Sequence, residues 1–348
     1  MAYSTIDKSS LHFNPIIYTG NGGTQALTGV GFQPDWVWVK SRDVAKDHML
    51  FDVVRGVQKS IRTNQNIVED TSSGYLTAFG TDGFTLGGNG KTNGNGNTFV
   101  AWNWKAGNSQ GSSNTAGSIN TTYTSVNTTA GFSISTYTGT AATATIGHGL
   151  GVVPKMIITK RISGGNEDWG VYHASVGATK YLKLNAEDAE GSSSGVWNDT
   201  APTNQVFSVG SSSLTNGSGT YVAYCFAEKK GYSKFGSYTG NGNANGTFVY
   251  TGFKPSWILI KTTDLAGNNW QMYDNKREGY NSQNDLLRAN SNNAEGNGTD
   301  PIDILSNGFK MYNTAGSANQ SGGTYIYMAF AAEPLVANVG QSIPATAR

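Results

Sequence analysis

The stretch Gly31-Phe32-Gln33-Pro34-Asp35-Trp36-Val37-Trp38-Val39-Lys40 occurs three times in this chain, in related forms. The second copy reads Gly151-Val152-Val153-Pro154-Lys155-Met156-Ile157-Ile158-Thr159-Lys160, and the third reads Gly252-Phe253-Lys254-Pro255-Ser256-Trp257-Ile258-Leu259-Ile260-Lys261. The apolar run after each proline has no polar face, which predicts a central strand covered on both sides. The proline suits a strand start, where its missing N–H costs no ladder bond.

Two further motifs flank every copy. A Tyr-Thr-Gly triplet precedes it, at residues 18–20, 137–139 and 238–240, and an aromatic strand closes it, at residues 98–104, 220–226 and 324–330. A period of roughly 100–120 residues is too long for a solenoid repeat and matches a whole small domain. We therefore interpret the chain as three copies of one module.

The closing strands alternate with period two. In the first copy Val100, Trp102 and Trp104 share a bulky face, while Ala101 and Asn103 share a smaller one. This pattern is typical of a strand inside a sandwich core. The predicted fold class is all-β, with three tandem related antiparallel β-sandwich (jelly-roll-like) modules, long Gly/Asn/Ser loops and only single helical turns.

The repeat boundaries predict the domain organisation. Residues 1–12 form an N-terminal arm and residues 335–348 a C-terminal tail. Residues 108–130, rich in Gly, Ser and Asn, have the composition of a linker. The three sandwich modules are module one (13–107), module two (131–230) and module three (231–334).

Composition narrows the classes of partner. The net charge is +1, and no basic cluster is longer than Lys229-Lys230, so a nucleic-acid-binding stripe is not expected. No apolar run is long enough for a membrane-spanning helix, and the N-terminus has no signal-peptide pattern. These features predict synthesis in a cytoplasm without membrane insertion. The single cysteine, Cys225, is expected to be buried in a closing strand.

Motifs for catalysis, cofactors and metals are weak. The four histidines lack metal-ligand spacing, so no metal site is predicted. The tract around Gly90-Lys91-Thr92 lacks the first glycine of a phosphate loop and leads into a strand, which predicts a long hairpin loop without nucleotide binding. We expect no catalytic and no cofactor-binding residues.

Acidic residues recur after the central strands, so glycoside hydrolysis must be weighed. Asp52 aligns roughly with His173 and Asp274, however, and no pair of acids is common to all three copies. We expect Asp52 to pair with Arg55 and hold the following loop, with a ligand contact as the alternative. The predicted protein is not an enzyme.

Four aromatic residues lie in polar, Gly/Ser/Asn-rich surroundings and could stack on sugar rings: Tyr75, Trp197, Tyr232 and Tyr280. Binding residues are often placed on such loops. We name these four as candidate ligand or receptor contacts, with the alternative that they anchor their loops to the sandwich.

Several motifs together resemble a domain family of marine bacteriophages. They are Tyr18-Thr19-Gly20-Asn21-Gly22, the quoted Gly31–Lys40 stretch, Asp82-Gly83-Phe84-Thr85-Leu86-Gly87 and Phe99-Val100-Ala101-Trp102-Asn103-Trp104-Lys105-Ala106-Gly107. Proteins with these motifs are described as tail-fibre-like or uncharacterised virion proteins, and the resemblance covers roughly residues 3–335.

The resemblance implies a non-enzymatic virion structural protein. We expect a tail appendage (fibre or adhesin) subunit for host attachment, located at the tail of the virion. Its partners would be other virion proteins, copies of itself in a homotrimer, and a host surface glycan. The alternatives are a capsid decoration or cement protein and a polysaccharide depolymerase.

Overall fold

The computed structural model describes residues 4–334. The predicted tail, residues 335–348, lies outside the described residues, as do the first three residues of the predicted arm. Strands make up 43% of the structure and helices 3%, and the strands form several antiparallel sheets. These values confirm the all-β prediction and the prediction of few helical turns.

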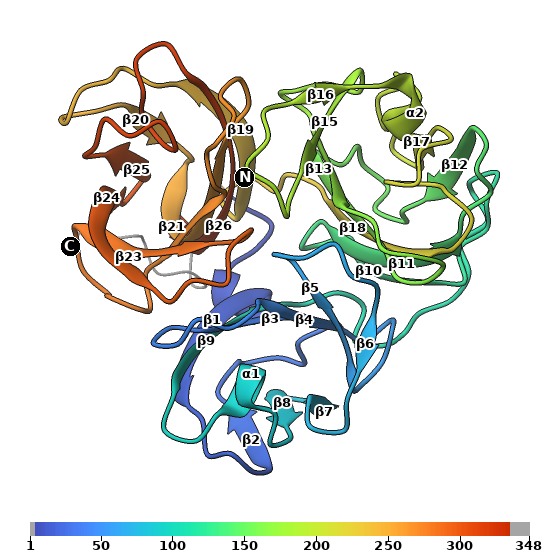
Figure 1. The fold of residues 1–348 in the computed structure, drawn as a ribbon, viewed down its shortest axis with the longest axis horizontal. Coiled ribbons are helices and arrows are strands. Elements are labelled where there is room, and N and C mark those ends of the chain that lie inside the picture. The colour runs from blue at the N-terminus through green and yellow to red at the C-terminus, as the bar shows by residue number, and fades with distance from the viewer. Residues whose placement is uncertain (1–3, 335–348) are drawn as a thin grey trace.

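The strands follow the order of the three repeats (Figure 1). Module one contains β1 (Phe13–Thr19), β2 (Gln25–Thr28), β3 (Trp36–Ser41), β4 (Met49–Asp52), β5 (Lys59–Arg62), β6 (Asp70–Thr71), β7 (Leu76–Gly80), β8 (Gly83–Leu86), α1 (Gly90–Asn93) and β9 (Thr98–Trp104), after the 3-10 turn η1 (Ser9–Leu11). Module two contains β11 (Phe132–Thr138), β12 (Ala144–Gly147), β13 (Met156–Arg161), β14 (Trp169–His173), β15 (Lys180–Lys183), β16 (Gly191–Ser192), α2 (Ser194–Trp197), β17 (Val206–Val209) and β18 (Thr220–Phe226), preceded by β10 (Tyr123–Asn127). Module three contains β19 (Ser233–Thr239), β20 (Phe248–Tyr250), β21 (Phe253–Thr262), β22 (Gln271–Asp274), β23 (Gln283–Arg288), β24 (Gly296–Leu305), β25 (Gly308–Met311) and β26 (Thr324–Pro334).

Each module has an inner and an outer layer of strands. In module one the inner sheet has the order β1-β9-β3-β4-β5-β6, and the outer sheet is β2-β8-β7. Module two repeats this plan with β10-β11-β18-β13-β14-β15-β16 inside and β12-β17 outside. In module three one eight-stranded sheet, β19-β26-β21-β22-β23-β24-β25-β20, curls into a nearly closed barrel.

The inner sheets of the three modules surround a common centre, so the modules form a ring (Figure 1). Their facing side chains make one central hydrophobic core, to which every module contributes, and each module keeps a second core of its own. The two faces of strand β3 belong to two different cores. Trp36 and Trp38 pack in the central core, while Val37 and Val39 pack in the core of module one. The prediction of a strand covered on both sides is confirmed.

Three backbone hydrogen bonds at equivalent positions join the modules into a closed ring. In each, the amide of a glutamate that directly precedes a strand (β6, β16 or β24) donates to the carbonyl of a residue just after a central strand of another module. They are Glu69 N to Ile162 O (3.2 Å), Glu190 N to Thr263 O (2.7 Å) and Glu295 N to Arg42 O (2.7 Å). The repeats are therefore related by an approximate threefold rotation within one chain.

The structure differs from the expected linker and arm. Within 108–130, strand β10 pairs with β11, and Ile119 forms a parallel bridge with Ile146. Short polar side chains hold this segment, as when Ser118 and Thr145 exchange side-chain-to-backbone hydrogen bonds of 2.9 Å. The arm also contributes to the fold, since Ile6 is buried in the central core.

Candidate functional site

The described residues contain no group of three or more His, Cys, Asp or Glu side chains that could hold a metal ion. Burial lowers the pKa of each of the four histidines, that of His173 to about 4. Cys225 is buried, as expected, and burial raises its pKa. The structure contains no helix long and apolar enough to cross a membrane, counted over residues 4–334.

The glycine-rich tract of module one is compact. Instead of an extended hairpin loop it contains the helical turn α1, capped by the side chain of Asn89. Lys91 Nζ lies 2.8 Å from Asp47 Oδ2, an ion pair within module one. The lysine of this tract therefore has a structural partner.

The recurring acids lie at the module interfaces. Asp52 forms an ion pair of 2.5 Å with Arg55, which confirms the expected pairing, and it accepts a hydrogen bond of 2.7 Å from the Tyr224 hydroxyl of module two. Asp274 repeats this with Arg277 (2.6 Å) and accepts from Trp102 Nε1 of module one at 3.0 Å.

At the third interface, between modules two and three, all three of the interacting residues are different. His173 replaces the aspartate, Val176 the arginine, and Met328, which cannot donate a comparable hydrogen bond, stands at the position of Tyr224 and Trp102. His173 Nε2 instead lies 3.3 Å from the carbonyl oxygen of Tyr327 in module three. Asp52 and Asp274 thus each join two modules, and they lie in different interfaces.

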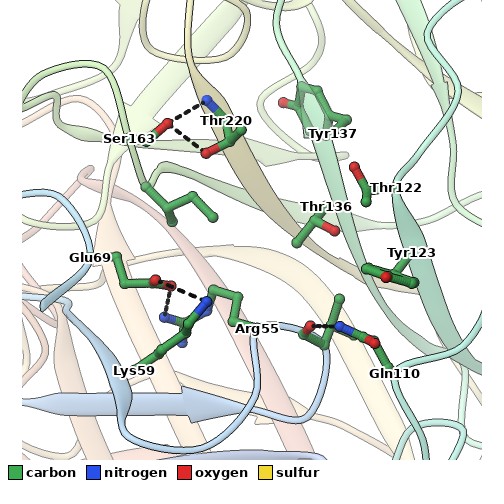
Figure 2. A pocket seen from close by; sticks show the side chains of 12 residues that line it. Arg55, Lys59, Glu69, Gln110, Thr122, Tyr123, Thr136, Tyr137, Ser163 and Thr220 are labelled. Atoms are coloured by element: carbon green, nitrogen blue, oxygen red, sulfur yellow. Dashed lines mark hydrogen bonds and ion pairs between the residues drawn. The ribbon is translucent and has the colours of Figure 1, made fainter. Parts of the chain in front are cut away.

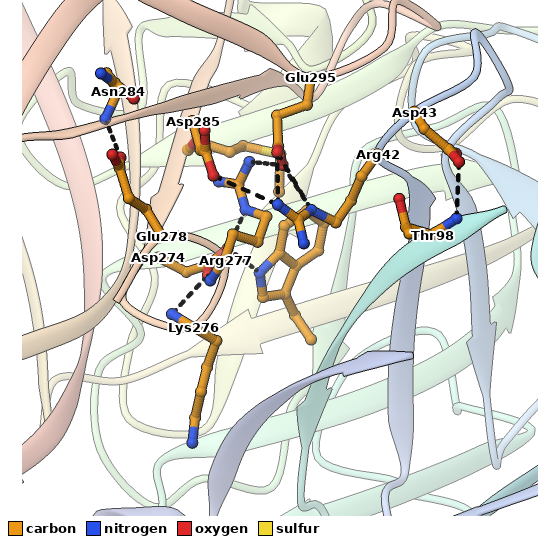
Figure 3. A network of polar contacts seen from close by, with 12 residues as sticks. Arg42, Asp43, Thr98, Asp274, Lys276, Arg277, Glu278, Asn284, Asp285 and Glu295 are labelled. Atoms are coloured by element: carbon orange, nitrogen blue, oxygen red, sulfur yellow. Dashed lines mark hydrogen bonds and ion pairs between the residues drawn. The ribbon is translucent and has the colours of Figure 1, made fainter. Parts of the chain in front are cut away.

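Figure 3 shows the interface between modules three and one. Arg42 crosses from module one and binds Glu295, with Nη2 at 2.8 Å from Oε1, and reaches Asp285 at 3.4 Å. Arg277 Nη1 contacts the same Glu295 carboxylate at 2.8 Å. Burial raises the pKa of Glu295, but the two arginines outweigh burial and hold it below its usual value. Charged side chains of both modules therefore occupy this part of the interface.

The matching position between modules one and two is open (Figure 2). A cavity of about 270 Å³ lies there, with Arg55, Lys59 and Glu69 on the module-one side. Its other wall belongs to module two and the strand before it, where Thr122, Tyr123, Thr136, Ser163 and Thr220 line the space. Ile162 stands where Arg42 stands between modules three and one and where Thr263 stands between modules two and three, so the cavity wall has an apolar side chain at this position.

Three buried lysines also repeat. Lys40, Lys160 and Lys261 end the quoted stretches, and none of them is exposed. Lys160 Nζ donates to the carbonyls of Glu167 (2.6 Å) and of Asn66 in module one (3.0 Å). Burial lowers the pKa of each of the three lysines to about 8.

The structure corrects most of the predicted aromatic contacts. Tyr75 and Trp197 pack in the cores of modules one and two, and Tyr232 packs in the central core against Phe330. All three are buried, so they offer no surface to a receptor, and the anchor alternative describes them. Tyr280 alone of the four is exposed, at 63%.

An exposed aromatic face that the sequence analysis missed lies on module three. Phe248 and Tyr250 point outward from β20, with exposed fractions of 44% and 54%. Lys310 lies opposite Phe248 on β25, and its Nζ is 5.0 Å from the ring centroid of the exposed Tyr312.

The other modules lack this face. The strand register places Phe248 and Tyr250 at the positions of Ala26 and Thr28 in module one, which are also exposed. In module two the same positions hold Thr145 and Gly147. The fold therefore needs no large ring there, and alignment of the three repeats could have revealed the difference.

Comparison with known proteins gives a family and no established function. No curated protein and no solved structure matches the chain. A family model described as a domain of unknown function, DUF7483, matches residues 8–334. Because this match spans nearly the whole three-module ring, the chain belongs to the DUF7483 family.

Proposed function

We propose that this protein is a non-enzymatic structural component of a bacteriophage particle, and that it serves in a tail appendage that attaches to the host surface. The resemblance of its repeated motifs to phage virion proteins supports the first part. The inward use of the acidic residues supports a binding or structural role, since Asp52 and Asp274 are buried in module interfaces.

The observation that carries the attachment role is the aromatic face of module three. Phe248 and Tyr250 are large, rigid and exposed at positions where Ala26 and Thr28 suffice for the fold. Aromatic residues are enriched at binding surfaces because they supply contact area at a low cost in conformational entropy. Each chain carries one such face, because only module three has it. The shared central core holds module three in a fixed position relative to the other two modules.

The first experiment locates the chain in intact particles by cryo-electron microscopy at subunit resolution. Density at the tail is expected, with module three directed away from the particle. Density over the capsid lattice would instead assign a decoration or cement role and refute the attachment role.

The second experiment tests the face itself. The double variant Phe248→Ala/Tyr250→Thr copies the residues of module one and should leave the melting temperature unchanged. Particles with this variant should adsorb to host cells with roughly tenfold lower affinity, the effect of losing ~1.4 kcal/mol of contact energy. Ile17→Thr, which removes another exposed apolar side chain (49%) from module one, is the matched control. Equal adsorption of the three particles would exclude the face as the contact.

A further inference from the structure

The cavity between modules one and two can be compared with the equivalent position of another interface, because the three modules are related by an approximate threefold rotation. Residues 42 and 162 occupy equivalent places, because their carbonyls accept equivalent hydrogen bonds from Glu295 and Glu69. Arg42 spans its interface and binds carboxylates of module three. Ile162 has no such reach, and a cavity of about 270 Å³ remains beside it. We propose that this cavity binds one neutral pyranose residue of a glycan.

The charges around the cavity exclude strongly charged ligands. Arg55 is fully committed, with contacts to Asp52 at 2.5 Å and Glu69 at 3.2 Å. Lys59 Nζ lies 3.6 Å from the other oxygen of Glu69. An anion would meet the Glu69 carboxylate, and a cation would meet Lys59 and Arg55. A neutral ligand avoids both repulsions.

The remaining lining suits a polyol. Thr122 and Ser163 line the cavity with hydroxyls that both donate and accept, and Ser163 Oγ is held in place by Thr220, whose Oγ1 lies at 2.7 Å and whose amide donates to it at 3.1 Å. Gln110 donates its Nε2 to the Val54 carbonyl at 2.8 Å, so its carbonyl oxygen is available to accept. Alternating donors and acceptors of this kind match the ring hydroxyls of a sugar.

The apolar parts and the size fit the same ligand. Ile162 and Val54 form an apolar patch, and the Tyr123 ring, 37% exposed, stands at the cavity wall, where it can pack against the C–H face of a sugar. The volume is below the roughly 300–1,000 Å³ of pockets for drug-sized ligands. This size suits a ligand as small as a single sugar ring.

The test titrates the full chain with neutral monosaccharides (glucose, galactose, mannose and N-acetylglucosamine), using saturation-transfer NMR and calorimetry. N-acetylneuraminic acid and glucosamine serve as anionic and cationic probes. We expect one neutral sugar to bind at a 1:1 ratio with a Kd on the order of 1 mM, which is weak binding suited to repeated contacts. Absence of neutral-sugar binding, or a preference for either charged probe, would overturn the inference.

Variants locate the binding site. Ile162→Arg places an arginine at the position that Arg42 has between modules three and one. The longer side chain should occupy the cavity and weaken sugar binding by more than tenfold. Tyr123→Ala should weaken it by a factor of roughly ten through loss of ring contact. Ile17→Thr, which removes an exposed apolar side chain (49%) that does not line the cavity, is the matched control and should bind like the wild type. Sugar binding that survives both changes at the cavity refutes the site, even if Ile162→Arg proves unstable, because Tyr123 is partly exposed and tolerates truncation.

This inference rests in part on the proposed attachment role, and the two can fail separately. Particle imaging decides where the chain is located, whereas sugar titration decides whether the cavity binds. Tail density without sugar binding would remove the cavity and leave the attachment role. Sugar binding with density on the capsid would keep the cavity and refute the tail location.

Discussion

Removing one charge from a module interface should lower the free energy of unfolding far more than replacing the whole set of interacting residues. The substitution Arg55→Val leaves Asp52 without its ion-pair partner in a site where the aspartate is not exposed to solvent. It also removes the hydrogen bond from Arg55 Nη2 to the Leu50 carbonyl and the contact with Glu69. Breaking a buried ion pair on one side costs about 3–5 kcal/mol, because the remaining charge is buried without compensation.

The chain itself supplies the compensating set. At the interface between modules two and three the matched residues are His173, Val176 and Met328, so none of these three positions holds a carboxylate. The triple variant Asp52→His/Arg55→Val/Tyr224→Met copies this set. It should recover at least ~2 kcal/mol of the loss in Arg55→Val, because exchanging a complete ion-pair set for a compatible one avoids the unpaired charge.

Urea unfolding followed by tryptophan fluorescence measures both variants, since all eight tryptophans are buried in the folded protein. Lys180→Ala is the control, because its pair with Glu190 is 41% exposed on the lysine side and should contribute at most ~1 kcal/mol. A triple variant no more stable than Arg55→Val would refute the reasoning that the three residues act as one replaceable unit.

Three further outcomes follow from the shared core and the buried lysines. Ile6→Ala should lower the free energy of unfolding by about 2–5 kcal/mol in the same urea assay, since Ile6 is buried in the central core; no loss would show that the arm is dispensable. Residues 131–230 expressed alone should fail to give a cooperative thermal transition in calorimetry, because their inner sheet would expose the Ile134 and Tyr224 faces that the ring covers; a sharp transition would contradict this. Between about pH 8 and 9.5 the free energy of unfolding should rise with pH, because the buried lysines, with pKa lowered to about 8, lose their protons while the same lysines of the unfolded chain keep theirs. Urea titrations at each pH measure this slope, and Lys160→Met should reduce it by roughly a third. An unchanged slope in Lys160→Met would exclude this lysine as a source of the pH dependence.

Much of the module could be predicted from the sequence because backbone periodicity is a local property. The run Trp36–Val39 indicated a strand covered on both sides, and the alternation of Val100, Trp102 and Trp104 indicated a bulky face. What covers those faces is a long-range property. A tryptophan face is equally satisfied by its own sandwich or by a neighbour, so the sequence pattern alone did not predict that three inner sheets share one core.

The candidate site was harder to predict, because neighbouring residues are a poor guide to exposure. Tyr75, Trp197 and Tyr232 lie in glycine- and serine-rich segments, yet each ring can remove 150–250 Å² from water. That gain draws the ring inward even from a polar loop. The interface cavity was also hidden, since its walls come from segments such as Glu69 and Thr220 that are distant in sequence and meet only through the ring.

Repetition within one chain separates the requirements of folding from those of function. Where all three modules keep a feature, such as the buried lysines, the fold itself accounts for it. Where an exposed or cavity-lining position differs in one module, the other two show that the fold does not require that difference. The rings of Phe248 and Tyr250 are a difference of this second kind. The equivalent positions 42, 162 and 263 hold Arg, Ile and Thr, so the fold does not require an arginine there either. Phe248, Tyr250 and Ile162 are therefore the positions at which substitution should alter binding and leave the three-module ring intact.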